Sequence, residues 1–321
     1  MEKVLFIYHF PLGEYAPLLD CIEIIRPATP LEKFSQAELM EHIKEATILI
    51  SAMDYPCGKE LIEAGTKLKA IGTVSVGFNN IDVETATKRG IAVINSPKEV
   101  TEPTAELTFA LIMAAARSIA RYDRDLRATR HWKTSMLLER DMMLHGKTLG
   151  VLGFGRIGKS VVQKALAFGM NIIYYDKFRA SSEDEQAFKA TYMSAEEVLA
   201  QADVVTLHMP YTPENHHLIN AESLALMKPS AYLVNAARGS LIDEKALVDA
   251  LRNGVIRGAG LDVHEDEPNI SEAVAALENV VLTPHVGTNI AEVRMRMLAE
   301  TLRGIKAVLA GEKPYNQVNT L

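Results

Sequence analysis

Residues 148–161 read TLGVLGFGRIGKSV, an apolar run that leads directly into three closely spaced glycines. The run 148–152 predicts a buried strand, and the pattern from Arg156 to about Phe168 predicts a helix. A Gly-x-Gly-x-x-Gly turn between strand and helix is typical of dinucleotide binding, because glycines permit a tight turn, close approach of a pyrophosphate and tight helix–strand packing. The pyrophosphate would lie at the helix N-terminus, where free N–H groups favour negative charge. The three glycines are Gly153, Gly155 and Gly158.

An acidic residue follows at the expected distance. Asp176 ends the next apolar run, 171–175, and lies 18 residues beyond Gly158. A carboxylate at this point accepts hydrogen bonds from ribose hydroxyls and repels a 2′-phosphate, so we expect NAD rather than NADP. Two nearby cations, Lys177 and Arg179, keep NADP open as the less favoured cofactor.

Short apolar segments alternate with helical patterns, such as residues 36–44, along the whole chain. The expected strands form a first series, 4–8, 47–50, 70–74 and 92–94, and a second series, 148–152, 171–175, 204–207, 231–234, 258–263 and 280–282. Strands that are almost continuously apolar are buried on both faces, which is typical of parallel sheets covered by helices. The sequence therefore predicts an α/β protein with two doubly wound parallel-sheet (Rossmann-like) domains and a cleft between them.

A domain boundary is expected near residue 98. The breaker Asn95-Ser96-Pro97 precedes a long helical pattern over Pro103–Arg121, and Pro103 suits a first helical turn. The stretch Tyr122–His145 has many Arg and Asp residues and little periodicity, which predicts an extended arm or loop. A last helix is expected over Ile290–Leu309.

Composition narrows the class of protein. The chain has 321 residues, 48% hydrophobic and 23% charged, which fits two globular domains. A net charge of −7 disfavours nucleic-acid binding, and no apolar run is long enough to span a membrane. The two cysteines, Cys21 and Cys57, lie in no metal or disulfide pattern, and no secretory signal is visible. We expect a soluble cytoplasmic protein without a metal.

Three segments place charged side chains directly after apolar strands. They are residues 235–239, 262–268 and 283–287. In an open α/β sheet such positions lie at the carboxyl edge, where ligands bind. Arg238 in the first segment can bind a carboxylate and polarise a carbonyl, and His285 in the third can exchange a proton near neutral pH. A neighbouring carboxylate from the second segment would orient the ring and favour its protonated form.

These residues belong to a wider set of motifs. The others are Val76–Asp82, Thr101–Arg117, His145–Gly150, His208–Pro210 and Asn316–Asn319. In this order and over essentially the whole chain, the sequence resembles the D-isomer-specific 2-hydroxyacid dehydrogenases, which include glyoxylate/hydroxypyruvate reductases and phosphoglycerate dehydrogenases. The resemblance implies hydride transfer between NAD(H) and a small 2-oxo or D-2-hydroxy acid.

The resemblance also implies a role for each matching residue. Arg238 binds the substrate carboxylate and carbonyl, and His285 is the general acid for reduction. Glu267 is the partner of His285, because the family places the paired carboxylate directly before a proline. Substrate binding is implied for Val76, Gly77, Arg238 and His285. Cofactor binding is implied for Gly153, Gly155, Arg156, Ile157, Gly158, Asp176, Met209, Pro210, Thr212, Ala236, Ala237, Arg238, Asp262, His285 and Gly287.

The resemblance implies a discontinuous chain organisation as well. Residues 1–98 and 287–321 would form the substrate domain, and residues 99–286 the NAD-binding domain. A homodimer through the NAD-binding domains is implied, which would explain the segment Tyr122–His145. In some relatives a Trp from this arm enters the partner's substrate pocket, and Trp132 is the candidate here.

The substrate is expected to be glyoxylate or hydroxypyruvate. Asp54, in the specificity loop Ser51–Pro56, is a poor neighbour for a phosphorylated acid, and the chain ends soon after its last helix. Phosphoglycerate dehydrogenase-type activity stays open as an alternative, as does a non-catalytic, dinucleotide-sensing partner protein. Formate dehydrogenase is disfavoured, because that family has Gln where this chain has Glu267.

Overall fold

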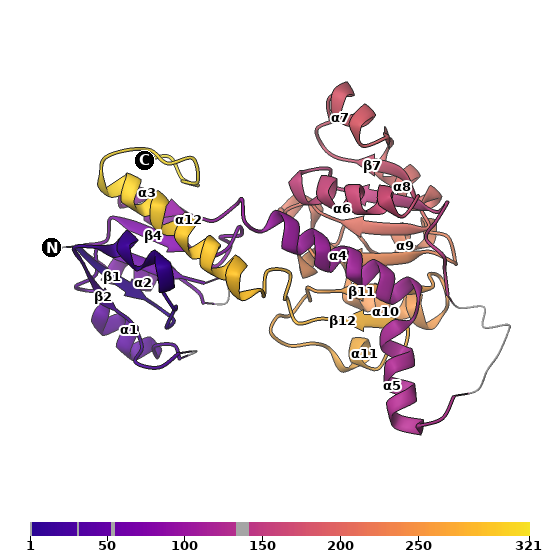
Figure 1. Cartoon of the computed structure of the whole chain (residues 1–321), viewed down its shortest axis with the longest axis horizontal. Helices are drawn as coiled ribbons and strands as arrows, with labels where there is room; N and C mark the ends of the chain where they lie inside the picture. The colour runs from indigo at the N-terminus through magenta and orange to yellow at the C-terminus, as the bar shows by residue number, and fades with distance from the viewer. Residues whose placement is uncertain (1, 31, 53–54, 133–140) are drawn as a thin grey trace. The chain divides into compact units, whose positions relative to one another are not determined.

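The computed structural model describes residues 2–30, 32–52, 55–132 and 141–321. The chain divides into two compact units, Met1–Val100 with Thr288–Leu321 (unit 1) and Thr101–Gly287 (unit 2) (Figure 1). These limits lie within two residues of the boundaries expected at 98 and 287. Within the described chain, no helix combines the length and the apolar character needed to cross a membrane.

Unit 1 contains a parallel sheet of five described strands in the order β2-β1-β3-β4-β5. The strands are β1 (Glu2–Phe6), β2 (Ile22–Ile25), β3 (Ile48–Ser51), β4 (Ala70–Thr73) and β5 (Ala92–Ile94). The helices are η1 (Gly13–Leu19), α1 (Gln36–His42), α2 (Lys59–Ala64), α3 (Val83–Lys88) and α12 (Ala291–Leu309). Helix α12, from the C-terminal part of the chain, packs on β4 and β5 and so completes the unit.

Unit 2 contains a parallel sheet of seven described strands in the order β12-β11-β10-β9-β6-β7-β8. The strands are β6 (Thr148–Leu152), β7 (Asn171–Tyr175), β8 (Ala190–Tyr192), β9 (Val204–Leu207), β10 (Tyr232–Asn235), β11 (Gly258–Leu261) and β12 (Val280–Leu282). The helices are α4 (Thr101–Ala116), α5 (Ile119–Thr129), α6 (Arg156–Ala167), α7 (Ser182–Ala187), α8 (Ala195–Gln201), α9 (Ala221–Leu226), α10 (Glu244–Arg252) and α11 (Glu272–Ala275), with short 3-10 turns η2 (Pro213–Asn215) and η3 (Gly239–Leu241). Two parallel-sheet α/β units confirm the predicted fold class.

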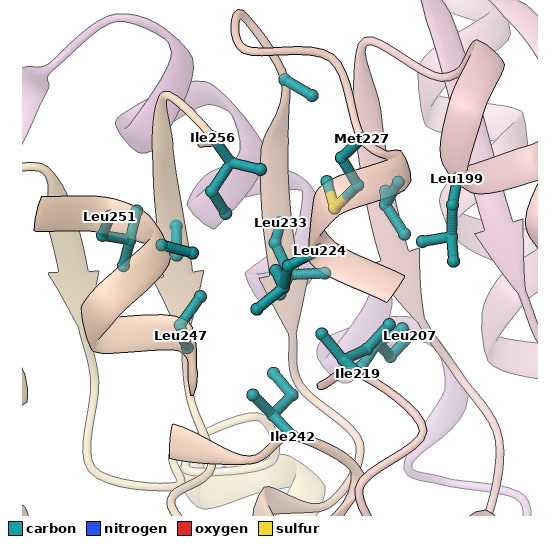
Figure 2. Close-up of a cluster of buried hydrophobic side chains, with 14 of the residues drawn as sticks. Leu199, Leu207, Ile219, Leu224, Met227, Leu233, Ile242, Leu247, Leu251 and Ile256 are labelled. Carbon is teal, nitrogen blue, oxygen red and sulfur yellow. The ribbon is translucent and has the colours of Figure 1, made fainter. Parts of the chain in front are cut away.

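Each face of the unit 2 sheet carries its own core. Successive strand residues point to opposite faces, so Leu233 packs on one side and Val234 on the other. Helices α8, α9 and α10 cover the first face, where Leu224 and Leu247 meet the strands (Figure 2). Helices α4 and α6 cover the second face. Burial on both faces explains why the strands are apolar throughout.

The structure corrects the expectation for residues 103–145. The single helix expected over Pro103–Arg121 is two helices, because Ser118 adopts a left-handed conformation (φ 49°) between α4 and α5. The loop expected from Tyr122 is wrong up to Thr129, since these residues belong to α5. Every described side chain of α5 is at least partly exposed, so no residue of this helix belongs to the buried core of unit 2.

The strand order of unit 2 reverses between β6 and β9, because the chain runs outward through β7 and β8 before it returns. Ligands bind such sheets at the carboxyl ends of the strands beside the reversal. The glycine loop follows β6 and His208 follows β9, so both lie at this point. The segments that carry Arg238, Asp262 and His285 follow β10, β11 and β12 at the same edge.

Candidate active site

The glycine loop between β6 and α6 is packed as a dinucleotide loop requires. A Cβ at Gly153, whose φ is +100°, would lie 2.6 Å from the main-chain carbon of His208. A Cβ at Gly158 would lie 2.3 Å from the carbonyl oxygen of Gly153, so neither position admits a side chain. At Gly155 a Cβ would meet nothing within 4 Å. Gly155 is the N-cap of α6 and thus borders open space at a helix N-terminus, which suits a pyrophosphate.

Asp176 lies at the end of β7, beside this loop. Its carboxylate accepts hydrogen bonds from the main-chain N–H groups of Phe154 (2.7 Å) and Phe178 (3.0 Å). The same side chain thus fixes the glycine loop and presents a negative charge where the ribose of a dinucleotide is expected. Arg179 is paired with Glu185 at 2.8 and 3.0 Å, so this cation is already engaged. The hydrogen bonds from Arg179 and from Tyr174 lower the pKa of Glu185 to about 2.

The segment after β9 contains Met209, Pro210 and Thr212, which were expected to contact the adenosine. Asn215 holds the segment, because its side chain donates to the Pro210 carbonyl (2.8 Å) and accepts from the Thr212 N–H (2.7 Å). The ring of His208 is hydrogen-bonded to the Thr206 hydroxyl at 2.9 Å, and withdrawal from water lowers the pKa of His208 to about 3. His208 is therefore neutral at pH 7. The open space at Gly155, the free helix end and Asp176 together fit NAD.

Arg238 lies in a loop that its own neighbours hold rigid. The buried side chain of Asn235, the last residue of β10, donates to the Arg238 carbonyl (2.8 Å) and accepts from the Ala237 N–H (2.9 Å). One guanidinium nitrogen of Arg238 donates to the Ala237 carbonyl at 2.6 Å. Burial lowers the pKa of Arg238 and the charge of Glu267 opposes that effect, so the two side chains interact. A guanidinium remains a cation under such conditions.

Asp262 organises the segment that carries His285. Its carboxylate is almost completely buried and accepts from the Thr283 hydroxyl (2.7 Å), the Val286 N–H (2.8 Å) and the Gly287 N–H (3.0 Å). Its carbonyl accepts from the His285 N–H at 2.7 Å. These bonds hold His285 in a left-handed conformation (φ 51°) that residues other than glycine rarely adopt. Asp262 was expected to contact the nicotinamide, and the structure uses its carboxylate to shape this loop.

Glu267 and His285 form a close pair. The Nδ1 atom of His285 lies 2.8 Å from Oε2 of Glu267, and Oε1 of Glu267 accepts from the His264 N–H at 3.0 Å. Burial acts to raise the pKa of Glu267, but the hydrogen bonds from His285 and His264 outweigh it, and the pKa of Glu267 lies below its usual value. The carboxylate is therefore ionised at pH 7, and Nδ1 carries the proton that it accepts.

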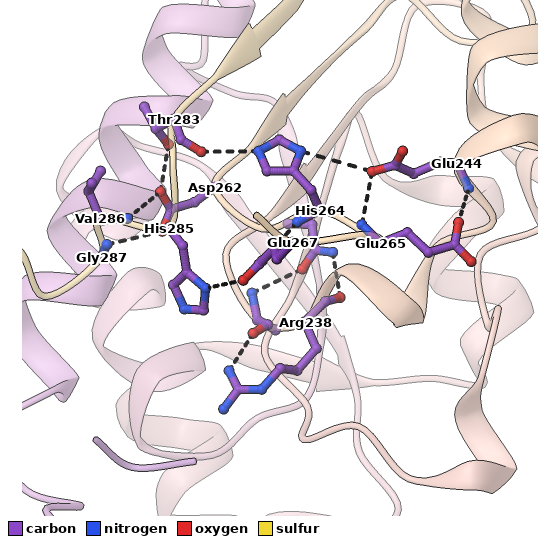
Figure 3. Close-up of polar contacts among 12 residues, drawn as sticks. Arg238, Glu244, Asp262, His264, Glu265, Glu267, Thr283, His285, Val286 and Gly287 are labelled. Atoms are coloured by element: carbon purple, nitrogen blue, oxygen red, sulfur yellow. Dashed lines mark hydrogen bonds and ion pairs between the residues drawn. The ribbon is translucent and has the colours of Figure 1, made fainter. Parts of the chain in front are cut away.

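Arg238, Glu267 and His285 project from three adjacent loops at the carboxyl edge of the sheet (Figure 3). The side chains of Arg238 and His285 extend to the same side, and Glu267 is bonded to one nitrogen of the His285 ring. The Arg238 loop packs closely on the loop after β11, because a Cβ at Gly239 would lie 1.9 Å from the carbonyl oxygen of His264. A cation, a proton donor and a carboxylate are thus brought together, as the chemistry of an anionic carbonyl compound requires.

Val76 and Gly77 follow β4 in unit 1. The Asn95 side chain donates to the Val76 carbonyl (2.9 Å), and the Ser75 hydroxyl donates to the Gly77 carbonyl (2.5 Å). The Val76 carbonyl shares its peptide plane with the N–H of Gly77, and the Ser75 carbonyl, which accepts from the Ser96 N–H at 2.9 Å, shares its plane with the N–H of Val76, so the directions of both N–H groups are fixed. Within the described residues no acceptor engages the N–H of Val76 or of Gly77, so both remain available to a ligand.

Two residues named from the sequence, Trp132 and Asp54, are not part of the arrangement described above. Trp132 is 73% exposed, and residues 133–140 of the expected arm Tyr122–His145 lie outside the described residues, as does Asp54. Sequence reasoning missed the buried side chains that hold the loops, Asn235 and Asn95. A polar residue at the end of an otherwise apolar strand is the signal that was present for both.

Comparison with known proteins identifies the family of the chain. The sequence model of the D-isomer specific 2-hydroxyacid dehydrogenase, NAD binding domain, matches residues 109–287. A glyoxylate reductase of Thermococcus litoralis is 43% identical over 88% of this chain and 86% of its own. A D-3-phosphoglycerate dehydrogenase of Methanocaldococcus jannaschii is 43% identical over 96% of this chain but only 58% of its own. The crystal structure of a glyoxylate reductase from Paecilomyes thermophila superposes with a TM-score of 0.86 at 33% identity, covering 99% of this chain and 98% of that one.

The matched NAD-binding region covers nearly all of unit 2, including the glycine loop and the segments that carry Arg238, Glu267 and His285. The predicted family and the predicted cofactor class are both confirmed. The chain belongs to the D-isomer specific 2-hydroxyacid dehydrogenase family and is an NAD-dependent oxidoreductase of small 2-oxo and D-2-hydroxy acids.

Proposed function

We propose that the protein reduces glyoxylate or hydroxypyruvate to the corresponding 2-hydroxy acid with NADH. The observation that carries this proposal is the pair formed between the loops after β11 and β12, in which His285 Nδ1 lies 2.8 Å from Glu267 Oε2. Reduction of a carbonyl needs a proton as well as a hydride, and this pair supplies a held proton donor. The similarity to proteins named glyoxylate reductase supports the choice of substrate.

The catalytic side chains divide the work between binding and proton transfer. Arg238 binds the substrate carboxylate and stabilises the charge that grows on the carbonyl oxygen. His285 gives a proton from Nε2 to that oxygen, because Nδ1 is held by Glu267. Glu267 orients the ring and stabilises the imidazolium before transfer. Bound NADH supplies the hydride that reduces the carbonyl carbon.

Other residues would hold the two ligands. The N–H groups of Val76 and Gly77 bind the substrate carboxylate, and this role is supported because no described residue accepts a hydrogen bond from either. Gly153, Gly155, Arg156, Ile157 and Gly158 bind the pyrophosphate. Asp176 binds the ribose, and Met209, Pro210 and Thr212 line the adenosine. The segments Ala236–Arg238 and His285–Gly287 lie toward the nicotinamide, with Asp262 holding the second of them.

We further propose a cytoplasmic homodimer that forms through unit 2. Helix α5 is partly or fully exposed along its length, and its residues Ile119 and Leu126 are 52% and 49% exposed. Trp132, 73% exposed just beyond this helix, would be covered by a second copy and remains the candidate for the partner's substrate pocket. The free cysteines Cys21 and Cys57 fit a reducing compartment.

The test is NADH oxidation by the purified protein against glyoxylate, hydroxypyruvate, phosphohydroxypyruvate, pyruvate and a branched 2-oxo acid, repeated with NADPH. We expect turnover of glyoxylate or hydroxypyruvate that His285→Ala abolishes. Preferred turnover of phosphohydroxypyruvate would replace this proposal by a phosphoglycerate dehydrogenase-type activity. Tight NADH binding with no turnover of any acid would favour a dinucleotide-sensing partner protein.

A further inference from the structure

His264 is a buried histidine beside the proposed catalytic pair, and it has no role in the chemistry derived above. It is only 5% exposed and lies in the loop after β11, between Asp262 and Glu267. Its Nε2 atom lies 3.2 Å from the carbonyl oxygen of Thr283. A carbonyl only accepts hydrogen bonds, so Nε2 carries a proton and donates it.

This one residue contacts all three loops of the site (Figure 3). Its side chain is bonded to Thr283, two residues before His285 in the chain. Its main-chain N–H donates to Glu267 Oε1 at 3.0 Å. Its carbonyl oxygen would lie only 1.9 Å from a Cβ placed on Gly239, the residue after Arg238, so the two main chains are in close contact. The ring therefore ties the loop that carries Glu267 to the loop that carries His285.

The other side of the ring faces a carboxylate. The Nδ1 atom of His264 lies 3.9 Å from Oε1 of Glu244, the first residue of α10, and has no hydrogen-bond partner among the described residues. Asp243 caps α10 by accepting from the Ala246 N–H (3.0 Å), which fixes the start of this helix. Glu244 Oε1 also accepts from the Glu265 N–H at 3.0 Å, so the same carboxylate holds the His264 loop in place.

We propose that His264 is a positioning residue, which aligns Glu267 with His285 by bridging their two loops through its Nε2 bond to Thr283. The inference rests on the roles proposed above for Glu267 and His285. It does not extend to Arg238, because the contact with Gly239 is made by main-chain atoms that a substitution at 264 keeps.

Charged groups of neighbouring segments lie around this bridge. Glu244 faces the ring from α10, and His217 faces Glu265 with its Nε2 atom 2.5 Å from Oε1. Arg238 interacts with Glu267 from the loop after β10. A substitution of His264 by an uncharged residue leaves all of these groups in place, so its effect can be read on the Glu267–His285 pair.

The experiment compares three variants. His264→Gln keeps an N–H donor near the place of Nε2, His264→Asn is polar but too short to reach Thr283, and His264→Phe keeps the ring without a donor. His42→Phe, on α1 in unit 1, controls for the gain of a phenyl ring. We measure kcat, KM and their pH dependence, the Kd for NADH, and the titration of His285 by NMR of histidine-labelled protein without substrate.

We expect His264→Asn and His264→Phe to lower kcat about 10- to 100-fold, the range expected when a catalytic group is displaced by up to ~1 Å. The Kd for NADH should stay within about twofold, since the hydrogen bond of the ring to Thr283 lies outside the glycine loop and Asp176, which bind the pyrophosphate and the ribose. The titration midpoint of His285 should move to lower pH in both variants, because its carboxylate partner is less well aligned. His264→Gln should restore most of kcat and the wild-type midpoint.

Equal loss in His264→Gln and His264→Asn would overturn the inference, since the bridging bond would then be irrelevant. So would a lowered kcat with an unmoved His285 midpoint in the Asn and Phe variants, which would show a merely structural role. The NMR titration needs no turnover. A wild-type protein that reduces no 2-oxo acid would therefore overturn the proposed function, while the midpoints would still decide the role of His264.

Discussion

Glu267 binds the Nδ1 side of His285 at 2.8 Å, which leaves Nε2 as the ring nitrogen that can meet a substrate. The same carboxylate receives the His264 N–H on its other oxygen, so it cannot rotate away without losing a second bond. The orientation of the His285 ring, the proposed proton donor, is thus set by a side chain that itself has little freedom.

Removal of the Glu267 charge should change the pH dependence of reduction. In Glu267→Gln the amide still contacts Nδ1 but no longer favours the imidazolium, so the basic limb of kcat/KM should move to lower pH. The pKa of Glu267 lies below its usual value, so in the wild type the negative charge that favours the imidazolium is present at neutral pH. This charge is lost only as pH falls through that lowered pKa. Steady-state rates between pH 4 and 9 test this. Glu265→Gln is the matched control, and an unmoved limb would remove Glu267 from its role.

Two glycines of one loop should respond differently to alanine. Gly158→Ala places a Cβ 2.3 Å from a main-chain oxygen and should destabilise unit 2, with a lower Tm and little soluble protein. Gly155→Ala places its Cβ in open space at φ −77°, so the apoprotein should keep its Tm. Its Kd for NADH should nevertheless rise about tenfold or more, because the methyl group occupies the approach of the pyrophosphate. Thermal unfolding and NADH titration separate the two effects. Unchanged NADH affinity in Gly155→Ala would show that the loop does not contact the cofactor.

The charge of Asp176 should determine which dinucleotide is used. Asp176→Asn retains an acceptor for the Phe154 N–H but removes the charge that repels a 2′-phosphate. We expect the ratio of kcat/KM for NADH over NADPH to fall about tenfold or more, with a mainly higher KM for NADH. Lys177→Gln, an exposed change next in the chain, should alter the ratio much less. An unchanged ratio in Asp176→Asn would place cofactor choice elsewhere.

The proposed function of Arg238 should not tolerate even a conservative substitution. Lysine keeps the charge but lacks the planar fork that binds a carboxylate with two hydrogen bonds. We expect Arg238→Lys to lower kcat/KM for the 2-oxo acid about 100-fold or more, through both KM and kcat, while NADH still binds. Arg252→Lys, at the exposed end of α10, is the control for the substitution itself. Near-normal kcat/KM in Arg238→Lys would assign substrate binding to another cation.

The lowered pKa of His208 predicts how the free energy of unfolding changes at acidic pH. Its pKa is lowered from 6.5 to about 3, so as pH falls below 6.5 the unfolded chain takes up a proton that the folded chain does not. The free energy of unfolding should therefore decrease between about pH 6.5 and pH 3. His208→Gln keeps a partner for Thr206 and should show a weaker decrease than the wild type in denaturant unfolding at pH 7 and pH 5. Parallel curves for the two proteins would contradict the lowered pKa, and His42→Gln serves as control.

Much of the fold was predictable because its signals are local. Buried parallel strands are apolar on both faces, and the glycine loop joins β6 to α6 as its sequence indicates. The segments after β10, β11 and β12 were recognisable because charged residues interrupt apolar runs. The strands β2 and β8 were missed, since edge strands of three or four residues with a charged or polar member carry little pattern. Helix α5 was missed because its start depends on the left-handed residue Ser118.

The supporting contacts of the site could not be predicted in the same way. Asp262 bonds to residues 283, 286 and 287, and His264 bonds to Thr283, only because β11 and β12 are neighbours in register. A single sequence does not state that register. The residues proposed to carry out the chemistry could thus be named from their type and place in the sequence, while the residues that hold their loops required the three-dimensional structure.

The first and last residues of unit 2 lie close together. A Cβ placed on Gly287, at the end of the unit, would lie 3.4 Å from Oγ1 of Thr104, near its start. Unit 2 is therefore an insertion with adjacent entry and exit points, and all five described strands of unit 1 precede it in the chain. Such an arrangement makes it possible to exchange the NAD-binding unit between relatives as one continuous segment of chain. We expect residues 101–287 expressed alone to bind NADH and to turn over no 2-oxo acid, and grafts between relatives to exchange cofactor preference without exchanging the acid.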